Sequence, residues 1–172
     1  FYSNTLFHGY TQDDSIVITE NMYTTQGISG IPGILSNDTF YGFFKTEGKA
    51  KLVSGGRYRP LTLVMFATGY QLFGESPLMG HLMNVVWFGV TCLMLYLLLL
   101  KLFKFEKEPE YAGMIAFCTA LLFAVHPIHT EVVANIKGRD EIIALLGSLA
   151  ALYFSIRAYR EKDNKLNLIG AG

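Results

Sequence analysis

Charged side chains are scarce in this sequence. Of its 172 residues 51% are hydrophobic and only 16% are charged, and 14 basic residues balance 14 acidic ones, for a net charge of +0. The balance excludes the strongly basic surface that binds nucleic acids. The apolar excess excludes an ordinary soluble domain, so the sequence predicts a chain that lies largely in a bilayer.

Cysteine is almost absent too. The two cysteines, Cys92 and Cys118, both fall inside apolar runs. This setting favours small buried apolar side chains over a disulfide or a metal pair. The chain begins at Phe1 rather than at methionine, and Leu166 to Gly172 resembles an apolar segment that has only begun, so we expect a piece of a longer protein.

Three apolar runs predict membrane spans at 77–103, 111–125 and 141–159, with the start of another at 166. The first run has no charged residue before Lys101 and is long enough, as a helix, to cross a bilayer core of about 30 Å. The second and third are near the lower limit for crossing. A shorter apolar stretch opens at Pro60 and predicts an interfacial helix up to Phe73, with the proline in its first turn.

Basic residues near the span ends predict the orientation. The loop after the first span holds Lys101, Lys104 and Lys107, and the segment after the third span holds Arg157, Arg160, Lys162 and Lys165. Both should therefore be cytoplasmic. By alternation, the loop 126–140 and everything before Pro77 face the opposite side. The predicted fold class is an all-α, multi-pass integral membrane protein, with an extracytoplasmic loop at 1–76 that contains short helices and a transmembrane helix bundle at 77–172.

Asp13 and Asp14 are adjacent carboxylates in the predicted outer loop. A carboxylate partly shielded from water can deprotonate an acceptor hydroxyl or orient a divalent cation bound to phosphate. The competing interpretation is an aspartate pair that caps a short helix or a turn.

Two imidazoles and a carboxylate lie within six residues at the outer end of the second span: His126, His129 and Glu131. Their spacing matches no closed zinc motif, so no metal site is predicted. Hydrogen-bonded imidazoles at the membrane interface are one interpretation, and contact with a lipid phosphate, supported by nearby cations, is another.

A run of charged residues opens the third span: Lys137, Arg139, Asp140 and Glu141. The two carboxylates suit a helix amino terminus, which is the structural interpretation. In the functional one, Arg139 grips a phosphate, and Arg57 and Arg59 offer a second cationic patch that could equally be an interfacial anchor. Within the first span, His81 and Asn84 are three residues apart and should point toward protein or water.

Taken together, four separated motifs resemble the transmembrane-and-tetratricopeptide-repeat O-mannosyltransferases and their bacterial relatives, within the C-type superfamily of membrane glycosyltransferases. The motifs occur in the same order over most of the chain. They are Gly9-Tyr10-Thr11-Gln12-Asp13-Asp14, Gly56-Arg57-Tyr58-Arg59-Pro60-Leu61, Gly80-His81-Leu82-Met83-Asn84, and His126-Pro127-Ile128-His129-Thr130-Glu131 with Gly138-Arg139-Asp140-Glu141.

This resemblance implies a transferase that moves a sugar, with inversion, from a polyprenyl- or dolichyl-phosphate to an acceptor hydroxyl, often of a protein Ser or Thr. Asp13 and Asp14 would lie at the catalytic centre. Side chains that would hold the donor phosphate are Arg57, Arg59, His126, His129 and Arg139, with Glu131, Lys137, Asp140 and Glu141 in support. Membrane lipid is an expected partner, and nucleic acid is not.

A bacterial inner membrane or the endoplasmic reticulum would house such an enzyme. The helix expected before the acidic loop, the later helices and the repeat domain are not in this sequence, so the piece alone should be inactive. The sugar, the acceptor and any cofactor stay open. The alternative function is a non-enzymatic membrane scaffold or transporter segment, in which the aspartates only cap a loop.

Overall fold

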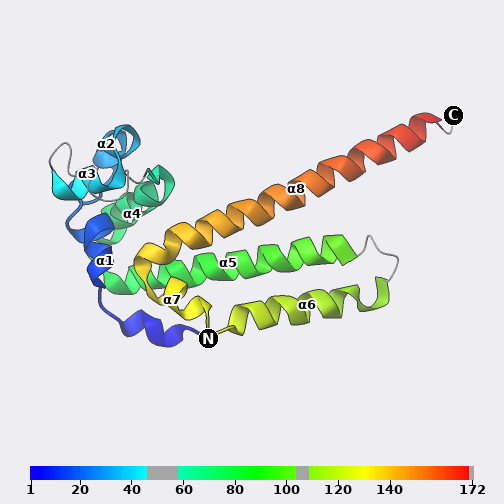
Figure 1. Ribbon diagram of the computed structural model, residues 1–172, viewed down its shortest axis with the longest axis horizontal. Helices are drawn as coiled ribbons and strands as arrows, with labels where there is room; N and C mark the ends of the chain where they lie inside the picture. The colour runs from blue at the N-terminus through cyan, green and yellow to red at the C-terminus, as the bar shows by residue number, and fades with distance from the viewer. Residues whose placement is uncertain (46–57, 104–108, 171–172) are drawn as a thin grey trace. The chain divides into compact units, whose positions relative to one another are not determined.

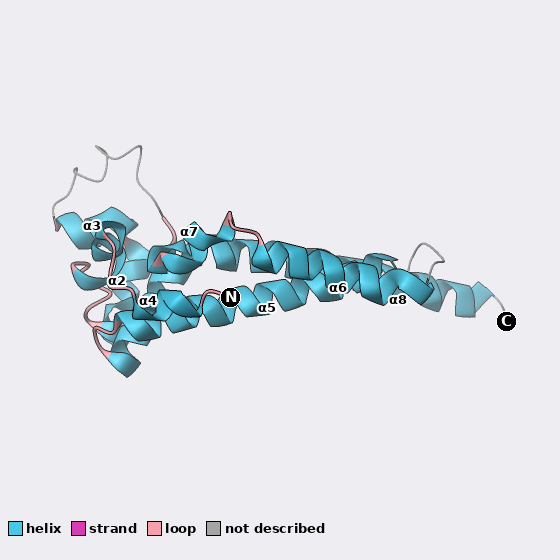
Figure 2. Cartoon of the chain, turned by 90° about the horizontal axis from the view of Figure 1, so that it is seen from below, coloured by secondary structure: helices cyan, strands magenta, loops and turns pink. Residues whose placement is uncertain are grey.

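The computed structural model describes residues 1–45, 58–103 and 109–170 (Figure 1). Every regular element within these ranges is a helix, joined by turns and loops (Figure 2). The predicted all-α class is therefore confirmed.

The chain divides into two compact units. The first comprises Phe1–Trp87 and Ile128–Ile142, and the second comprises Phe88–Pro127 and Ile143–Gly172. This division concerns packing, whereas the predicted division at residue 76 concerns the two sides of a membrane, so the one does not test the other.

In the first unit, short helices pack on α4, which spans Pro60–Phe73. Proline suits the first turn because its missing N–H would have no partner there, and the helix stops at Gly74, whose φ of +65° favours glycine. The predicted helix opening at Pro60 is thus confirmed. Its buried face, which includes Leu63, Phe66 and Ala67, forms the core of the unit with Val17, Ile18, Ile34 and Ile136.

Within residues 1–45 the chain folds into six short helices. They are η1 (Ser3–Phe7), α1 (Gln12–Asp14), η2 (Ser15–Thr19), η3 (Gly27–Gly30), α2 (Ile31–Ser36) and α3 (Thr39–Phe44). The fully buried Asn21 joins η2 to α3, because its amide donates to the carbonyls of Ile16 and Thr39 and its oxygen accepts from two backbone N–H groups. Gly42 lies so close to this amide that a Cβ there would come within 2.4 Å of Oδ1.

The longest apolar helix is α5, Pro77–Phe103, whose bounds are those predicted for the first span. The last helix, α8, runs from Arg139 to Gly170 and includes the predicted third span. It continues through Leu166, where the sequence predicts the start of a separate segment. Between them lie α6 (Pro109–Val125), α7 (His129–Ala134) and η5 (Ile136–Gly138).

Two stretches, Pro77–Phe103 and Ile136–Arg160, are long and apolar enough to cross a membrane, whereas Tyr111–Val125 is shorter. Only 17% and 11% of the residues in their most apolar windows are buried within the chain. The core helix of a soluble protein would be mostly buried, so these exposed apolar faces favour contact with lipid or with further helices.

The second unit holds the remainder of α5 and α8 together with α6. Phe88 stacks on Phe123 with ring centroids 6.1 Å apart, and the Lys101 ammonium lies 4.5 Å from the centroid of the Tyr153 ring. The thiols of Cys92 and Cys118 are free, and Cys92 is half-buried whereas Cys118 is exposed.

Candidate functional site

The two adjacent aspartates lie in different environments. Asp14 is fully buried at the end of α1, where it closes a capping box with Thr11. One of its carboxylate oxygens accepts from the backbone N–H of Thr11 at 2.8 Å and from the Thr11 hydroxyl at 3.0 Å. The other accepts from the backbone N–H of Lys137 at 2.9 Å. The capping interpretation therefore holds for Asp14.

Asp13, in contrast, is exposed. Its carboxylate forms an ion pair with the Lys137 ammonium at 2.7 Å, and 54% of its side-chain surface remains accessible. Because Lys137 binds Asp14 through its backbone and Asp13 through its side chain, one residue holds both carboxylates.

A polar cavity of about 310 Å³ opens beside Asp13. Arg59 and Asp140, which line it from α4 and α8, form an ion pair. Six of the charged residues predicted from the sequence gather here: Asp13, Arg59, Glu131, Lys137, Asp140 and Glu141, along with Val132, Asn135 and Gly138. The volume is at the lower end of the range for small-molecule sites.

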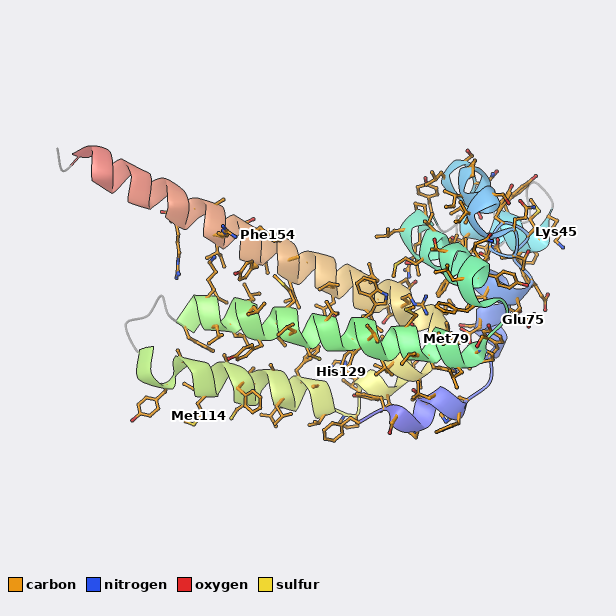
Figure 3. All side chains as sticks on the ribbon, turned by 180° about the vertical axis from the view of Figure 1, so that it is seen from behind. Lys45, Glu75, Met79, Met114, His129 and Phe154 are labelled. Carbon is orange, nitrogen blue, oxygen red and sulfur yellow. The ribbon has the colours of Figure 1, made fainter. Side chains whose placement is uncertain are left out.

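The other predicted site residues that the structure describes do not line this cavity. Asp14 and Arg139 are buried, and Arg57 lies outside the described residues. His126 belongs to the second unit. His129 begins α7 and is half-buried (Figure 3).

Arg139 is 4% exposed, at the first position of α8. Its Nε donates to Oδ1 of Asn84 at 2.9 Å, and one terminal nitrogen donates to the carbonyl of Gly80 at 2.9 Å. The guanidinium carbon lies 4.6 Å from the centroid of the Phe66 ring. These contacts hold the buried cation within the first unit, and its predicted contact with a donor phosphate stays a prediction.

Asn84 is the residue whose importance the sequence shows only in part. The prediction that it and His81 point inward is confirmed, since both are fully buried. The Asn84 amide donates to the carbonyl of Asn135 at 2.8 Å and to that of Ile136 at 3.3 Å. An asparagine within an apolar run signals a polar partner, but the sequence does not name the partner.

Tyr10 lies near the acidic pair and lines a smaller cavity of about 40 Å³ together with Arg139. Burial, reinforced by the negative charges of Glu75 and Asp14, raises the pKa of Tyr10 to about 12. The Tyr10 phenol is therefore protonated at neutral pH, and it can donate a hydrogen bond there.

The cavity thus combines four carboxylates, of which Asp13, Glu131 and Glu141 belong to exposed residues, with two cations, Arg59 and Lys137. Such a set can accept a proton and stabilise an anion. Throughout the part of the chain that the structure describes, no three His, Cys, Asp or Glu side chains are grouped so as to hold a metal ion.

Comparison with known proteins gives a consistent result. Over 150 residues, or 87% of this chain, it is 36% identical to protein O-mannosyl-transferase TMTC1 of Homo sapiens. Identity to protein O-mannosyl-transferase TMTC3 of Homo sapiens is 33% over 165 residues, or 96% of the chain. The chain is homologous to the TMTC protein O-mannosyl-transferases. A TMTC1 protein of Drosophila melanogaster is 34% identical over 92% of the chain.

The chain spans 16% of the length of the human TMTC1 and TMTC3 proteins. It corresponds to their amino-terminal portion. No family model matches the sequence, and no solved structure matches it. The resemblance to the O-mannosyltransferases seen in the four motifs is confirmed by these relatives, whereas the role of each site residue stays a prediction.

Proposed function

We propose that this chain carries part of the catalytic face of a membrane glycosyltransferase. The enzyme moves a sugar from a polyprenyl- or dolichyl-phosphate to a Ser or Thr hydroxyl of a protein. The observation that carries the proposal is the accessible Asp13 carboxylate beside Lys137 in a polar cavity, within a chain homologous to protein O-mannosyl-transferases. The name of these relatives favours mannose as the sugar.

Asp13 is the proposed general base. Its carboxylate takes the proton of the acceptor hydroxyl while the hydroxyl oxygen attacks the anomeric carbon of the sugar. The bond from that carbon to the phosphate oxygen breaks on the opposite face, so the configuration inverts. The lipid phosphate leaves with the electron pair, and the proton stays on Asp13.

Charge develops on the departing phosphate, and cations in the cavity stabilise it. Lys137 and Arg59 are the proposed stabilising cations, since both line the cavity. Arg57, His126 and His129 remain predicted donor contacts. Asp140 orients Arg59 through their ion pair, and Glu131 and Glu141 complete the polar wall. Asp14 and Arg139 are buried and have the proposed role of holding the residues of the cavity in position.

The proposed location is a membrane, either a bacterial inner membrane or that of the endoplasmic reticulum. α5 and α8 cross it, and the short helices of the first unit lie at its extracytoplasmic face. The low burial of both apolar helices supports this placement.

The test is sugar transfer by membranes that contain the full-length protein, supplied with radiolabelled polyprenyl-phosphate sugars. Asp13→Asn should abolish transfer at normal expression, because the amide cannot accept the proton. Glu20→Gln is the matched control: it also neutralises an exposed carboxylate, but one that lies outside the cavity. Unchanged transfer by Asp13→Asn would remove Asp13 from the mechanism, and no transfer by the wild type from any donor would favour the scaffold alternative.

A further inference from the structure

We infer that Asn84, a residue of α5, is a positioning residue that fixes where the carboxylates of Asp13 and Asp14 lie. Its amide fixes the backbone of residues 135–136, and this backbone places Lys137 where it can hold Asp13 and Asp14. The inference rests on the proposed function for its kinetic consequence, whereas its structural part stands on the contacts alone.

Both ends of the Asn84 amide are occupied. The nitrogen donates to the carbonyls of Asn135 and Ile136, and the oxygen accepts from Nε of Arg139. The side chain is fully buried, so water cannot replace these partners. Removing the amide nitrogen would therefore leave the carbonyl of Asn135 without this donor in a dry environment.

Lys137, the residue after Ile136, connects the hydrogen bonds of Asn84 to the cavity. The backbone N–H of Lys137 donates to Oδ1 of Asn135 at 3.1 Å and to Oδ1 of Asp14 at 2.9 Å. Its ammonium reaches Asp13 at 2.7 Å. A continuous series of contacts thus connects Asn84, through the turn at residues 135–137, to Asp13, the proposed base. An active site needs such support from neighbouring residues to keep a precise geometry.

Close packing fixes the register of the turn against α5. A Cβ on Gly80, one helical turn before Asn84, would lie 2.6 Å from the end of the Ile136 side chain. Ile136 is itself fully buried. The turn therefore has little freedom to shift without losing the Asn84 contacts.

The substitution Asn84→Asp, made in the full-length protein, tests the hydrogen bonds to residues 135–136 separately from the hydrogen bond with Arg139. The aspartate keeps an oxygen for Nε of Arg139 but loses the donor to residues 135–136. Asn21→Asp is the matched control, because Asn21 is a similarly buried asparagine of the same unit whose side chain hydrogen-bonds to residues 16, 23, 24 and 39. If Asn84→Asp does not fold, Asn84→Ser removes the same donor without adding charge.

Two quantities are measured for folded protein: amide hydrogen exchange of the segment 135–138, and the kcat and donor KM of sugar transfer. We expect Asn84→Asp to speed exchange about tenfold or more and to lower kcat about tenfold or more, with the donor KM within about threefold of wild type. Asn21→Asp should change neither exchange at 135–138 nor kcat. A purely structural role would lower the yield or the thermal stability while kcat per folded molecule stays constant.

Unchanged exchange at 135–138 in Asn84→Asp would overturn the inference, as would unchanged kcat in an active enzyme. If the wild type transfers no sugar at all, the proposed function fails, and exchange alone decides whether Asn84 holds the turn. The failure of the inference about Asn84 is therefore distinguishable from the failure of the proposed function.

Discussion

The backbone N–H of Lys137 donates to Oδ1 of Asp14 at 2.9 Å, although 123 positions separate the two residues in the sequence. This contact joins the short α1 helix to the turn that precedes α8. It leaves Asp14 with three donors and leaves its neighbour Asp13 accessible. Two adjacent residues of the same type therefore have separate tasks, one structural and one proposed to be chemical.

This separation predicts opposite effects of two similar substitutions on stability. Asp14→Ala leaves the Thr11 and Lys137 N–H groups without their buried acceptor and should destabilise the protein by about 3 kcal/mol. Asp13→Ala removes only an exposed ion pair and should cost less than about 1 kcal/mol. Thermal unfolding of the full-length protein in detergent measures both. Equal destabilisation by the two substitutions would contradict the division of roles.

Lys137→Met should separate activity from stability. The substitution removes the ammonium that contacts Asp13 but keeps the backbone N–H that binds Asp14. We expect a stability change of less than about 1 kcal/mol and a loss of sugar transfer of about 100-fold, because one stabilising charge leaves the cavity. Lys45→Met, an exposed lysine outside the cavity, serves as the control. Normal transfer by Lys137→Met would exclude a role for its charge.

Gly138 should tolerate no side chain. A Cβ there would lie 2.3 Å from the carbonyl oxygen of Val132, which is backbone and cannot rotate away. Gly138→Ala should therefore destabilise the protein by about 1–3 kcal/mol. Gly69→Ala, in α4 of the same unit, meets nothing within 4 Å and should be neutral or stabilising by up to about 1 kcal/mol. Thermal stability and the yield of folded protein are the measurements, and a neutral Gly138→Ala would disprove the close approach.

The raised pKa of Tyr10 predicts a loss of stability in alkali. The pKa rises from its ordinary value of 10.0 to about 12 on folding, so the folded chain holds the phenol proton more tightly than the unfolded chain. The resulting stabilisation is complete below pH 10 and is lost as the pH rises toward 12. Tyr10→Phe should reduce the alkaline slope of thermal stability. The difference in phenolate absorbance between wild type and Tyr10→Phe should titrate near pH 12, and a midpoint near 10 would contradict the burial of Tyr10.

Local patterns in the sequence were enough to predict the long helices. The bounds of α5 follow from an uninterrupted apolar run after Pro77, and α4 follows from Pro60 in its first turn. The start of α8 at Arg139 precedes the predicted span by two residues, because the first turn carries the charged residues Asp140 and Glu141 at a helix amino terminus.

The site itself could be predicted only as a set of residues. The spacing of Thr11 and Asp14 fits a capping box and indicates that Asp14 caps α1, but it does not show which aspartate faces the cavity. That outcome depends on Lys137, which is distant in sequence. The Asn84–Arg139 contact likewise joins residues 55 positions apart, and no local periodicity encodes such a pair.

The hydrogen bonds of Asn84 also limit how the length of α5 can vary among related proteins. One residue inserted between Gly80 and Asn84 would rotate Asn84 by about 100° around the helix axis and carry its amide away from the turn before α8. The Gly80 carbonyl and the Asn84 oxygen would then no longer face the same arginine. Insertions and deletions should therefore be excluded from the first two turns of α5 in functional homologues, and changes of length should occur instead toward its far end.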